Sequence, residues 1–183
     1  MKIPIEKLKA IILFFCTYTE PKFLGKVKLM KLIYFLDFMH VKKYVSPVTY
    51  DNYVHLNYGP IPSTILNLVS EVSDDFDNAA LSDVISIERK QGADIHRIIP
   101  SRKFNQDDAK YFSKSELKMM RKVCTRFGRS NTKTIEEASK KETPYIKTAS
   151  GENISYVLAA KDLDCEVSEE EIKLMSKIFQ KDG

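Results

Sequence analysis

The sequence of 183 residues contains no tryptophan and three cysteines, Cys16, Cys124 and Cys165, which lie far apart and form no CxxC pair. An odd number of isolated cysteines offers no disulfide framework and indicates a reducing compartment. The longest apolar run near the N-terminus, Ala10 to Cys16, has seven residues, whereas a membrane span needs about 20. No small-residue cleavage site follows this run, which argues against a signal peptide. We therefore expect a cytoplasmic domain without contact to a membrane.

Sequence signatures of catalysis are also missing. The six glycines stand singly, and the chain has no phosphate-binding loop, HExxH, GxSxG or dinucleotide fingerprint. Asp37 and His40 are spaced to meet on one helix face, where they could ligate a metal or relay a proton. A metal site needs three or four ligands, so we favour a polar stripe of the helix. Cys16 and Cys124 fall on apolar faces and are predicted core residues. We expect no enzyme activity and no cofactor or metal.

Charge is distributed unevenly along the chain, although the formal net charge is only +4. Residues 1–50 and 113–148 each carry +6 and residues 89–112 carry +3, whereas residues 51–88 and 149–183 carry −7 and −4. The length fits one ordinary domain with a short appendage. Separate basic and acidic faces favour the steering of binding partners.

The hydrophobic pattern predicts two helices near the N-terminus. Apolar residues recur at helical spacing over residues 5–18, and Pro21 and Gly25 interrupt the pattern after them. Residues 26–43 form a second predicted helix that is apolar almost all round, which is typical of a helix buried in the middle of its domain. The charged residues within it argue against a membrane span, namely Lys28, Lys31 and Asp37.

Residues 44–58 are rich in strand-forming types, so we expect a short strand there. Pro60 and Pro62 are predicted to end the sheet, and Pro62 to open a helix at its first position. The apolar residues of that helix that should face inward are Ile65, Leu66, Val69 and Val72. Further on, two alternating segments, 84–88 and 94–99, flank residues 91–93 and predict a β-hairpin.

Three later segments have capping-box spacing: Ser113 with Glu116, Thr134 with Glu137, and Ser168 with Glu171. They predict helices over about 113–127, about 134–141 and from 168 onward. The last of these carries the apolar residues Ile172, Met175, Ile178 and Phe179. The predicted fold class is α+β and mainly α-helical, a compact helical domain with a small antiparallel β-sheet or hairpin.

One helix face is basic. Lys114, Lys118, Arg121 and Lys122 share a face of the helix over 113–127, and such a face can contact a phosphate backbone. The sequence has no helix-turn-helix or other reading motif beside it, so a solvated helix face is the favoured interpretation. A nucleic-acid-binding regulator that uses this face remains an alternative function.

Three tyrosines are candidate binding residues for a protein partner. Tyr50, Tyr53 and Tyr58 lie close together in the sequence, and tyrosine is frequent among the residues that anchor protein interfaces. The alternative is that these tyrosines cover the core with their hydroxyl groups in water.

Two segments together resemble a known family, the Panacea domain of SocA-like antitoxins and phage-associated GepA-like proteins. The first is residues 28–40, KLMKLIYFLDFMH, and the second is residues 56–65, LNYGPIPSTI. A later short helix followed by Glu142-Thr143-Pro144-Tyr145 also fits. The positions that match the family motifs are Lys28, Leu29, Lys31, Leu32, Ile33, Tyr34, Tyr58, Gly59, Pro60, Pro144 and Tyr145.

The resemblance implies an antitoxin that neutralises a protein toxin by direct contact, the toxin being commonly encoded by an adjacent gene. It implies residues 1–150 as the antitoxin domain, and we expect residues 151–183 to be a C-terminal extension whose terminal helix packs on the same domain. An alternative function is that of an adaptor that delivers a partner protein to a ClpXP-type protease, for which the family offers a precedent.

Overall fold

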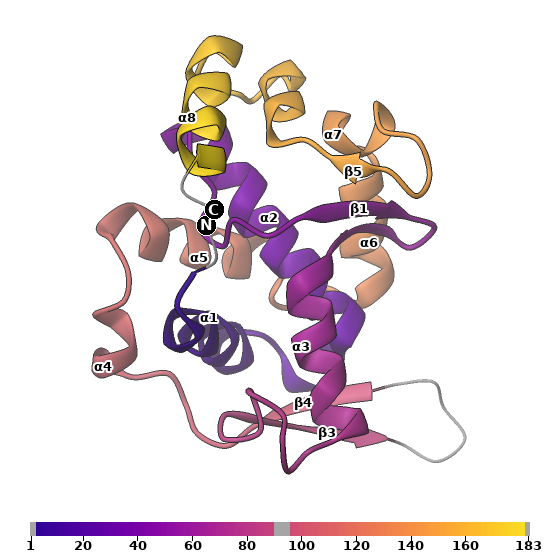
Figure 1. Ribbon diagram of the computed structural model, residues 1–183. Helices are drawn as coiled ribbons and strands as arrows, with labels where there is room; N and C mark the ends of the chain where they lie inside the picture. The colour runs from indigo at the N-terminus through magenta and orange to yellow at the C-terminus, as the bar shows by residue number, and fades with distance from the viewer. Residues whose placement is uncertain (1–2, 90–95, 182–183) are drawn as a thin grey trace.

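The computed structural model describes residues 3–89 and 96–181 (Figure 1). The element around which the rest is arranged is α2 (Lys26–Tyr44), which contacts α1 (Ile5–Tyr18), α5 (Lys114–Phe127) and α6 (Thr132–Lys140), as well as both sheets. Neighbours on every side explain why the helix is apolar almost all round. Every residue of α2 from Lys28 to Lys42 is buried, the charged ones included. The predicted bounds of α1 and the central position of α2 are confirmed.

A three-stranded antiparallel sheet lies against α2 and α6. Its order is β2 (Gly59–Pro62), β1 (Tyr53–Leu56) and β5 (Asn153–Ile154), with Tyr53 opposite both Pro62 and Ile154. The prediction that Pro60 and Pro62 end the sheet is wrong, because both lie within β2. The sheet tolerates them because β2 is an edge strand, where a missing backbone N–H leaves no neighbour without a partner.

The helix α3 (Ser63–Asp74) follows β2 directly and buries Ile65, Val69 and Val72. Its predicted start is wrong by one position, since Pro62 precedes the first helical residue instead of occupying it. The Asp51 carboxylate caps this end from a distance, because it accepts hydrogen bonds from the backbone N–H groups of Thr64 and Ile65 at 3.1 and 2.8 Å.

The second sheet is the predicted hairpin, in which β3 (Ile85–Arg89) pairs antiparallel with β4 (His96–Pro100). The intervening turn at 91–93, together with Asp94 and Ile95, lies outside the described residues. The helix α3 contacts both β2 and β3, so the two sheets lie at its opposite ends (Figure 1).

Short helices and two longer ones complete the chain. They are η1 (Pro21–Phe23), α4 (Gln106–Ala109), α5, α6, α7 (Thr143–Ile146), η2 (Tyr156–Lys161) and α8 (Glu169–Lys181). The capping boxes at Ser113 and Ser168 are confirmed by reciprocal hydrogen bonds with Glu116 and Glu171.

The capping box predicted at Thr134 is wrong. Asn131 caps α6 instead, and the Thr134 N–H donates to its side-chain oxygen at 2.9 Å from within the helix. Both residue types cap well, and the asparagine lies three positions earlier, so it sets the start of the helix. The helix α8 packs on η2, with Ile172 buried and Ile178 exposed. The side chain of Phe179 lies outside the described residues.

The fold is α+β and mainly helical, with a small antiparallel sheet and a separate hairpin, as predicted. Among the residues that the structure describes, no helix combines the length and apolar character that a membrane crossing requires.

Candidate functional site

The two segments that carry the family motifs meet at Lys31 of α2. The fully buried Lys31 ammonium donates a hydrogen bond to the Pro60 carbonyl at 2.7 Å. Gly59 has a left-handed φ of 90°, and a Cβ at this position would lie 2.8 Å from Ser139 Oγ of α6 and 3.0 Å from Lys31 Nζ. Glycine is therefore required twice, by its backbone conformation and by the close approach of two side chains.

Lys28 holds α2 against a different part of the chain. Its ammonium donates to the carbonyl oxygens of Gly128 and Ser130, at 3.1 and 2.5 Å, in the connection between α5 and α6. Burial lowers the pKa of Lys28 to about 8, and it lowers that of Lys31 to about 7 against the attraction of Glu136. The two motif lysines therefore join helices and loops inside the domain, and neither ammonium group reaches the surface.

The motif residues Pro144 and Tyr145 attach α7 to the first sheet. The Tyr145 hydroxyl donates to the Leu56 carbonyl at 3.0 Å, and its ring stacks on His55 with centroids 3.7 Å apart. Pro144 is buried, and its carbonyl accepts a hydrogen bond from Thr148 Oγ1 at 2.7 Å. Lys31 of α2 and Tyr145 of α7 therefore both hold the turn between β1 and β2 in place. The remaining motif residues, Leu29, Leu32, Ile33 and Tyr34, are buried in the core.

Asp37 is a buried carboxylate at the centre of a polar network. It accepts hydrogen bonds from the Tyr53 and Tyr156 hydroxyls at 2.9 and 3.1 Å, and from the backbone N–H groups of Val48 and Thr49 at 2.8 Å each. Burial raises its pKa although these donors act against the rise. His40 does not join this network.

The side chains of His40 and Asp37 have separate hydrogen-bond partners. The His40 ring nitrogens face the Ser46 carbonyl at 2.6 Å and the Ser115 hydroxyl at 3.2 Å. Within residues 3–89 and 96–181, no three His, Cys, Asp or Glu side chains are arranged to hold a metal ion. Burial raises the pKa of the Cys16 and Cys124 thiols to about 12, which favours their neutral form.

Lys42 near the end of α2 is surrounded by carboxylates. Its ammonium lies 2.5 Å from Glu142, 2.8 Å from Asp162 and 2.9 Å from Asp164. Burial acts to lower the pKa of Lys42, but the hydrogen bonds to Asp162 and Glu142 outweigh it and raise the pKa. This cluster joins α2 both to the motif segment that begins at Glu142 and to the residues after η2.

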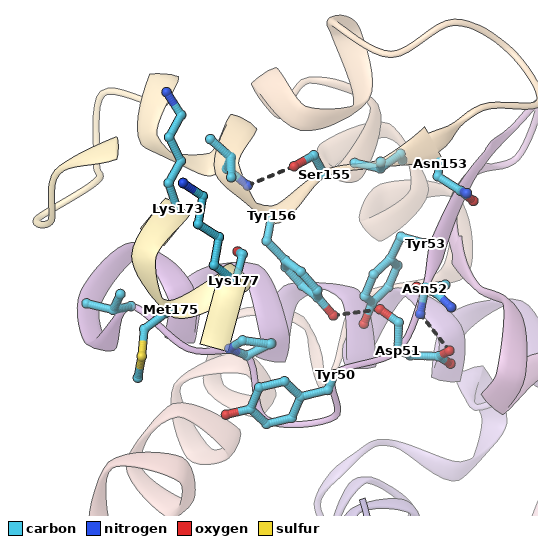
Figure 2. A pocket seen from close by; sticks show the side chains of 15 residues that line it. Tyr50, Asp51, Asn52, Tyr53, Asn153, Ser155, Tyr156, Lys173, Met175 and Lys177 are labelled. Carbon is cyan, nitrogen blue, oxygen red and sulfur yellow. Dashed lines mark hydrogen bonds between the residues drawn. The ribbon is translucent and has the colours of Figure 1, made fainter. Parts of the chain in front are cut away.

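A depression of about 530 Å³ lies between the 45–53 segment, β5, η2 and α8 (Figure 2). Tyr53 and Tyr156 line its inner side, and Lys173 and Lys177 of α8 also belong to its lining. The Tyr156 hydroxyl also donates to the Asp51 carbonyl at 2.9 Å. Because both tyrosine hydroxyls are bonded internally, the depression offers side-chain surface and no free acid or nucleophile from these two residues.

The structure separates the three candidate tyrosines. Tyr53 is 1% exposed and belongs to the core, with its hydroxyl bonded to Asp37, so it presents no surface to a partner. Tyr50 is partly exposed and lines the depression of Figure 2. Tyr58 is 69% exposed, in the turn between β1 and β2.

Sequence reasoning missed two exposed apolar residues on the segments that meet near the turn of Tyr58. Leu56 is 40% and Ile146 is 65% exposed, and the bond from Tyr145 to Leu56 brings their two segments together. Leu56 and Tyr145 are 89 positions apart in the sequence, so the local sequence pattern gives no sign that they pair.

The four basic candidates lie together as the helical pattern predicts. Lys114, Lys118, Arg121 and Lys122 are all exposed along α5, whose opposite face is buried. Arg126, farther along the helix, lies over the rings of Phe35 and Phe127 at 5.3 and 4.7 Å from their centroids. Arg126 is exposed like the four candidates, but its guanidinium also contacts these aromatic rings.

Comparison with known proteins identifies the family. No curated protein and no solved structure gives a significant match to the chain. The family model described as "Antitoxin SocA-like, Panacea domain" matches residues 29–146, which is more than half of the chain. The matched range begins in α2 and ends with α7, and it contains the contacts of Lys31, Gly59 and Tyr145 described above. The chain therefore belongs to the SocA-like antitoxin family with a Panacea domain.

Proposed function

We propose that this protein is an antitoxin that neutralises a protein toxin by direct contact, and that an adjacent gene encodes the toxin. The observation that carries the proposal is the family match over residues 29–146. The motif residues support a binding role, since Lys31, Gly59 and Tyr145 make internal contacts that hold a surface turn in place.

We further propose where the toxin binds. The hairpin-tip surface, which we define as Leu56, Tyr58 and Ile146, exposes three large apolar side chains on two segments that the Tyr145–Leu56 hydrogen bond joins. Large exposed aromatic and aliphatic residues are frequent energetic centres of protein interfaces. Lys141 and Lys147, which precede and follow α7 in the sequence, are both exposed. A toxin surface with an apolar centre and acidic groups around it would be complementary.

The support beneath this surface favours tight binding. The turn between β1 and β2 is bonded to α2 through Lys31 and to α7 through Tyr145. A turn that is already ordered loses little conformational entropy when a partner binds it. The motif residues Lys31 and Tyr145 thus contribute to binding by fixing the turn, without contact to the toxin.

The experiment is co-expression with the product of the adjacent gene, followed by isolation of the complex. The double variant Tyr58→Ala with Ile146→Ser should weaken toxin binding about 30-fold or more, because loss of interface anchors commonly costs at least 2 kcal/mol. Phe76→Ala is the matched control, since Phe76 is 48% exposed but lies beyond α3. A gene product that is harmless alone, or a lethal one that forms no complex with this protein, would refute the antitoxin role. Equal effects of the double variant and of Phe76→Ala on toxin binding would refute the hairpin-tip surface as the binding site.

The same assay separates blocking from delivery to a protease. If the protein only blocks the toxin, the half-life of the toxin is unchanged by co-expression. A half-life that falls on co-expression and recovers in a host without ClpXP would support an adaptor instead. Neutralisation inside the cell also tests the predicted cytoplasmic location.

We propose in addition that residues 151–183 belong to the same folded unit as residues 1–150. Three contacts support this division: β5 pairs with β1, Tyr156 donates to Asp37, and Asp162 pairs with Lys42. Each contact joins the extension to an element of the antitoxin domain. A fragment that ends at residue 150 should accordingly be unstable.

A further inference from the structure

A second cavity lies away from the hairpin-tip surface, and of the two motif segments only Lys28 lines it. It has a volume of about 620 Å³ and is formed where the start of α2, the start of α6 and β4 meet. We call it the basic cavity, because its lining includes Lys22, Lys26, Lys28, Arg97 and Lys133.

The cations of the basic cavity are not neutralised by its own lining. None of the described residues that line it is an aspartate or a glutamate. The Lys22 and Lys28 ammonium groups both lie over the Phe23 ring, at 4.9 and 5.5 Å from its centroid. Lys28 donates its hydrogen bonds to neutral carbonyl groups. Like charges gathered in this way attract an anion.

Two further lysines of the lining have weak or neutral partners. Lys26 donates to the Ser70 hydroxyl at 2.9 Å, which leaves its charge uncompensated. Lys133 lies 3.9 Å from Glu137, and both side chains of this pair are largely exposed. An exposed pair at this distance contributes little and is easily exchanged for another anion.

Arg97 supplies the most specific observation. Its Nε atom is buried and has no hydrogen-bond partner among the described residues. The β4 backbone around it is held firmly, because the Ile98 N–H donates to the Leu24 carbonyl at 3.2 Å. A Cβ on Gly25 would lie only 3.0 Å from the His96 carbonyl oxygen, so glycine permits this close approach. An unbonded buried donor is unfavourable, and a ligand oxygen would remove that penalty.

The backbone adds to the attraction for anions. The helices α2 and α6 both begin at residues that line the cavity, Lys26 and Thr132. Gly25 precedes α2 and has no side chain that could cap the first N–H groups of this helix. The N-terminal end of a helix carries a partial positive charge, which reinforces the side-chain cations here.

We infer that the basic cavity binds the phosphate groups of a small nucleotide. Its volume lies within the range of small-molecule sites, about 300–1,000 Å³. Phe23 and Val27 offer apolar surface for a base and sugar, while Arg97, Lys22, Lys26 and Lys133 line the cavity and can bind the phosphates. This site is independent of the proposed toxin contact.

The test is calorimetric titration of the full-length protein with ATP and, separately, with pyrophosphate at low ionic strength. Both should bind, ATP more tightly because of its apolar part, and added salt should weaken both. Arg97→Gln and Lys133→Gln should each weaken ATP binding about tenfold, as expected for the loss of a hydrogen bond to a charged group. Thermal unfolding of each variant checks that the fold is retained.

The matched control is the double variant Lys118→Gln with Arg121→Gln, which removes charge from the exposed face of α5 outside the cavity. This variant should leave ATP binding within about twofold of that of the unmodified protein, because solvent screens the charges of Lys118 and Arg121 from the ligand. Absence of binding by both probes, or an equal loss in the control, would overturn the inference. A DNA duplex that binds more tightly than ATP and is released by Arg97→Gln would identify nucleic acid as the ligand instead.

Discussion

The ammonium group of Lys31 donates to the carbonyl group of Pro60 at 2.7 Å, and this bond joins the two sequence segments by which the family is recognised. One segment is the buried helix α2 and the other is the turn into β2. A tertiary hydrogen bond inside the domain therefore connects these two motif segments. It preserves the position of the turn that carries Tyr58, which explains why residues without surface exposure accompany a binding function.

Gly59 is expected to be the least tolerant position of this contact. Gly59→Ala should destabilise the protein by about 3 kcal/mol, because a left-handed φ costs about 1–2 kcal/mol and the new Cβ overlaps Ser139 and Lys31. Gly151→Ala is the matched control, since Gly151 has a φ of 84° but nothing within 4 Å of its Cβ position. It should lose only the backbone contribution. Urea denaturation measures both, and equal losses would contradict the steric argument.

Lys31 should make stability depend on pH. Burial lowers its pKa in the folded state to about 7 from 10.5, so the unfolded state binds more protons between these values. The free energy of unfolding therefore rises as the pH increases from 7 toward 10.5, by up to about 5 kcal/mol from this group. Lys31→Met should show a flatter profile in urea denaturation, whereas Lys118→Met, at an exposed lysine, should keep the original slope. Parallel pH profiles for the unmodified protein, Lys31→Met and Lys118→Met would contradict the role assigned to the Lys31 pKa.

Tyr156 should stabilise the domain through its hydroxyl group. Tyr156→Phe removes the single hydroxyl that lies 3.1 Å from the Asp37 carboxylate and 2.9 Å from the Asp51 carbonyl. The loss should cost about 1–3 kcal/mol, because one acceptor is a buried carboxylate. Tyr111→Phe, at an exposed tyrosine, should have almost no effect. Thermal unfolding followed by circular dichroism compares the two, and similar midpoints would argue against the network.

Lys42 is expected to be essential for folding near neutral pH. Lys42→Met leaves the carboxylates of Glu142, Asp162 and Asp164 without their shared cation, and should cost about 3–5 kcal/mol. The loss should shrink as the pH falls toward the range in which carboxyl groups become protonated. Lys43→Met removes the exposed pair with Glu166 and should change stability little. A loss that stays constant from neutral to acidic pH would contradict the charge argument.

The sequence by itself determined the long helices and the capping residues at Ser113 and Ser168. These features depend on neighbours within a few positions: the apolar period of α1 and α2, and a serine followed three residues later by a glutamate. The β3–β4 hairpin was also readable because its strands are close in sequence. The order and spacing of the motif residues were sufficient to indicate the family.

Tertiary structure decided what local rules leave open. Pro60 and Pro62 are compatible with a strand only because β2 lies at the edge of its sheet, and Asn131 and Thr134 are equally good caps until the packing of α6 selects one. Tyr53 and Tyr58 look alike in sequence, but α2 covers the first and nothing described covers the second. Contacts between residues far apart in the chain determine exposure, so the hairpin-tip surface and the basic cavity emerge only from the folded structure.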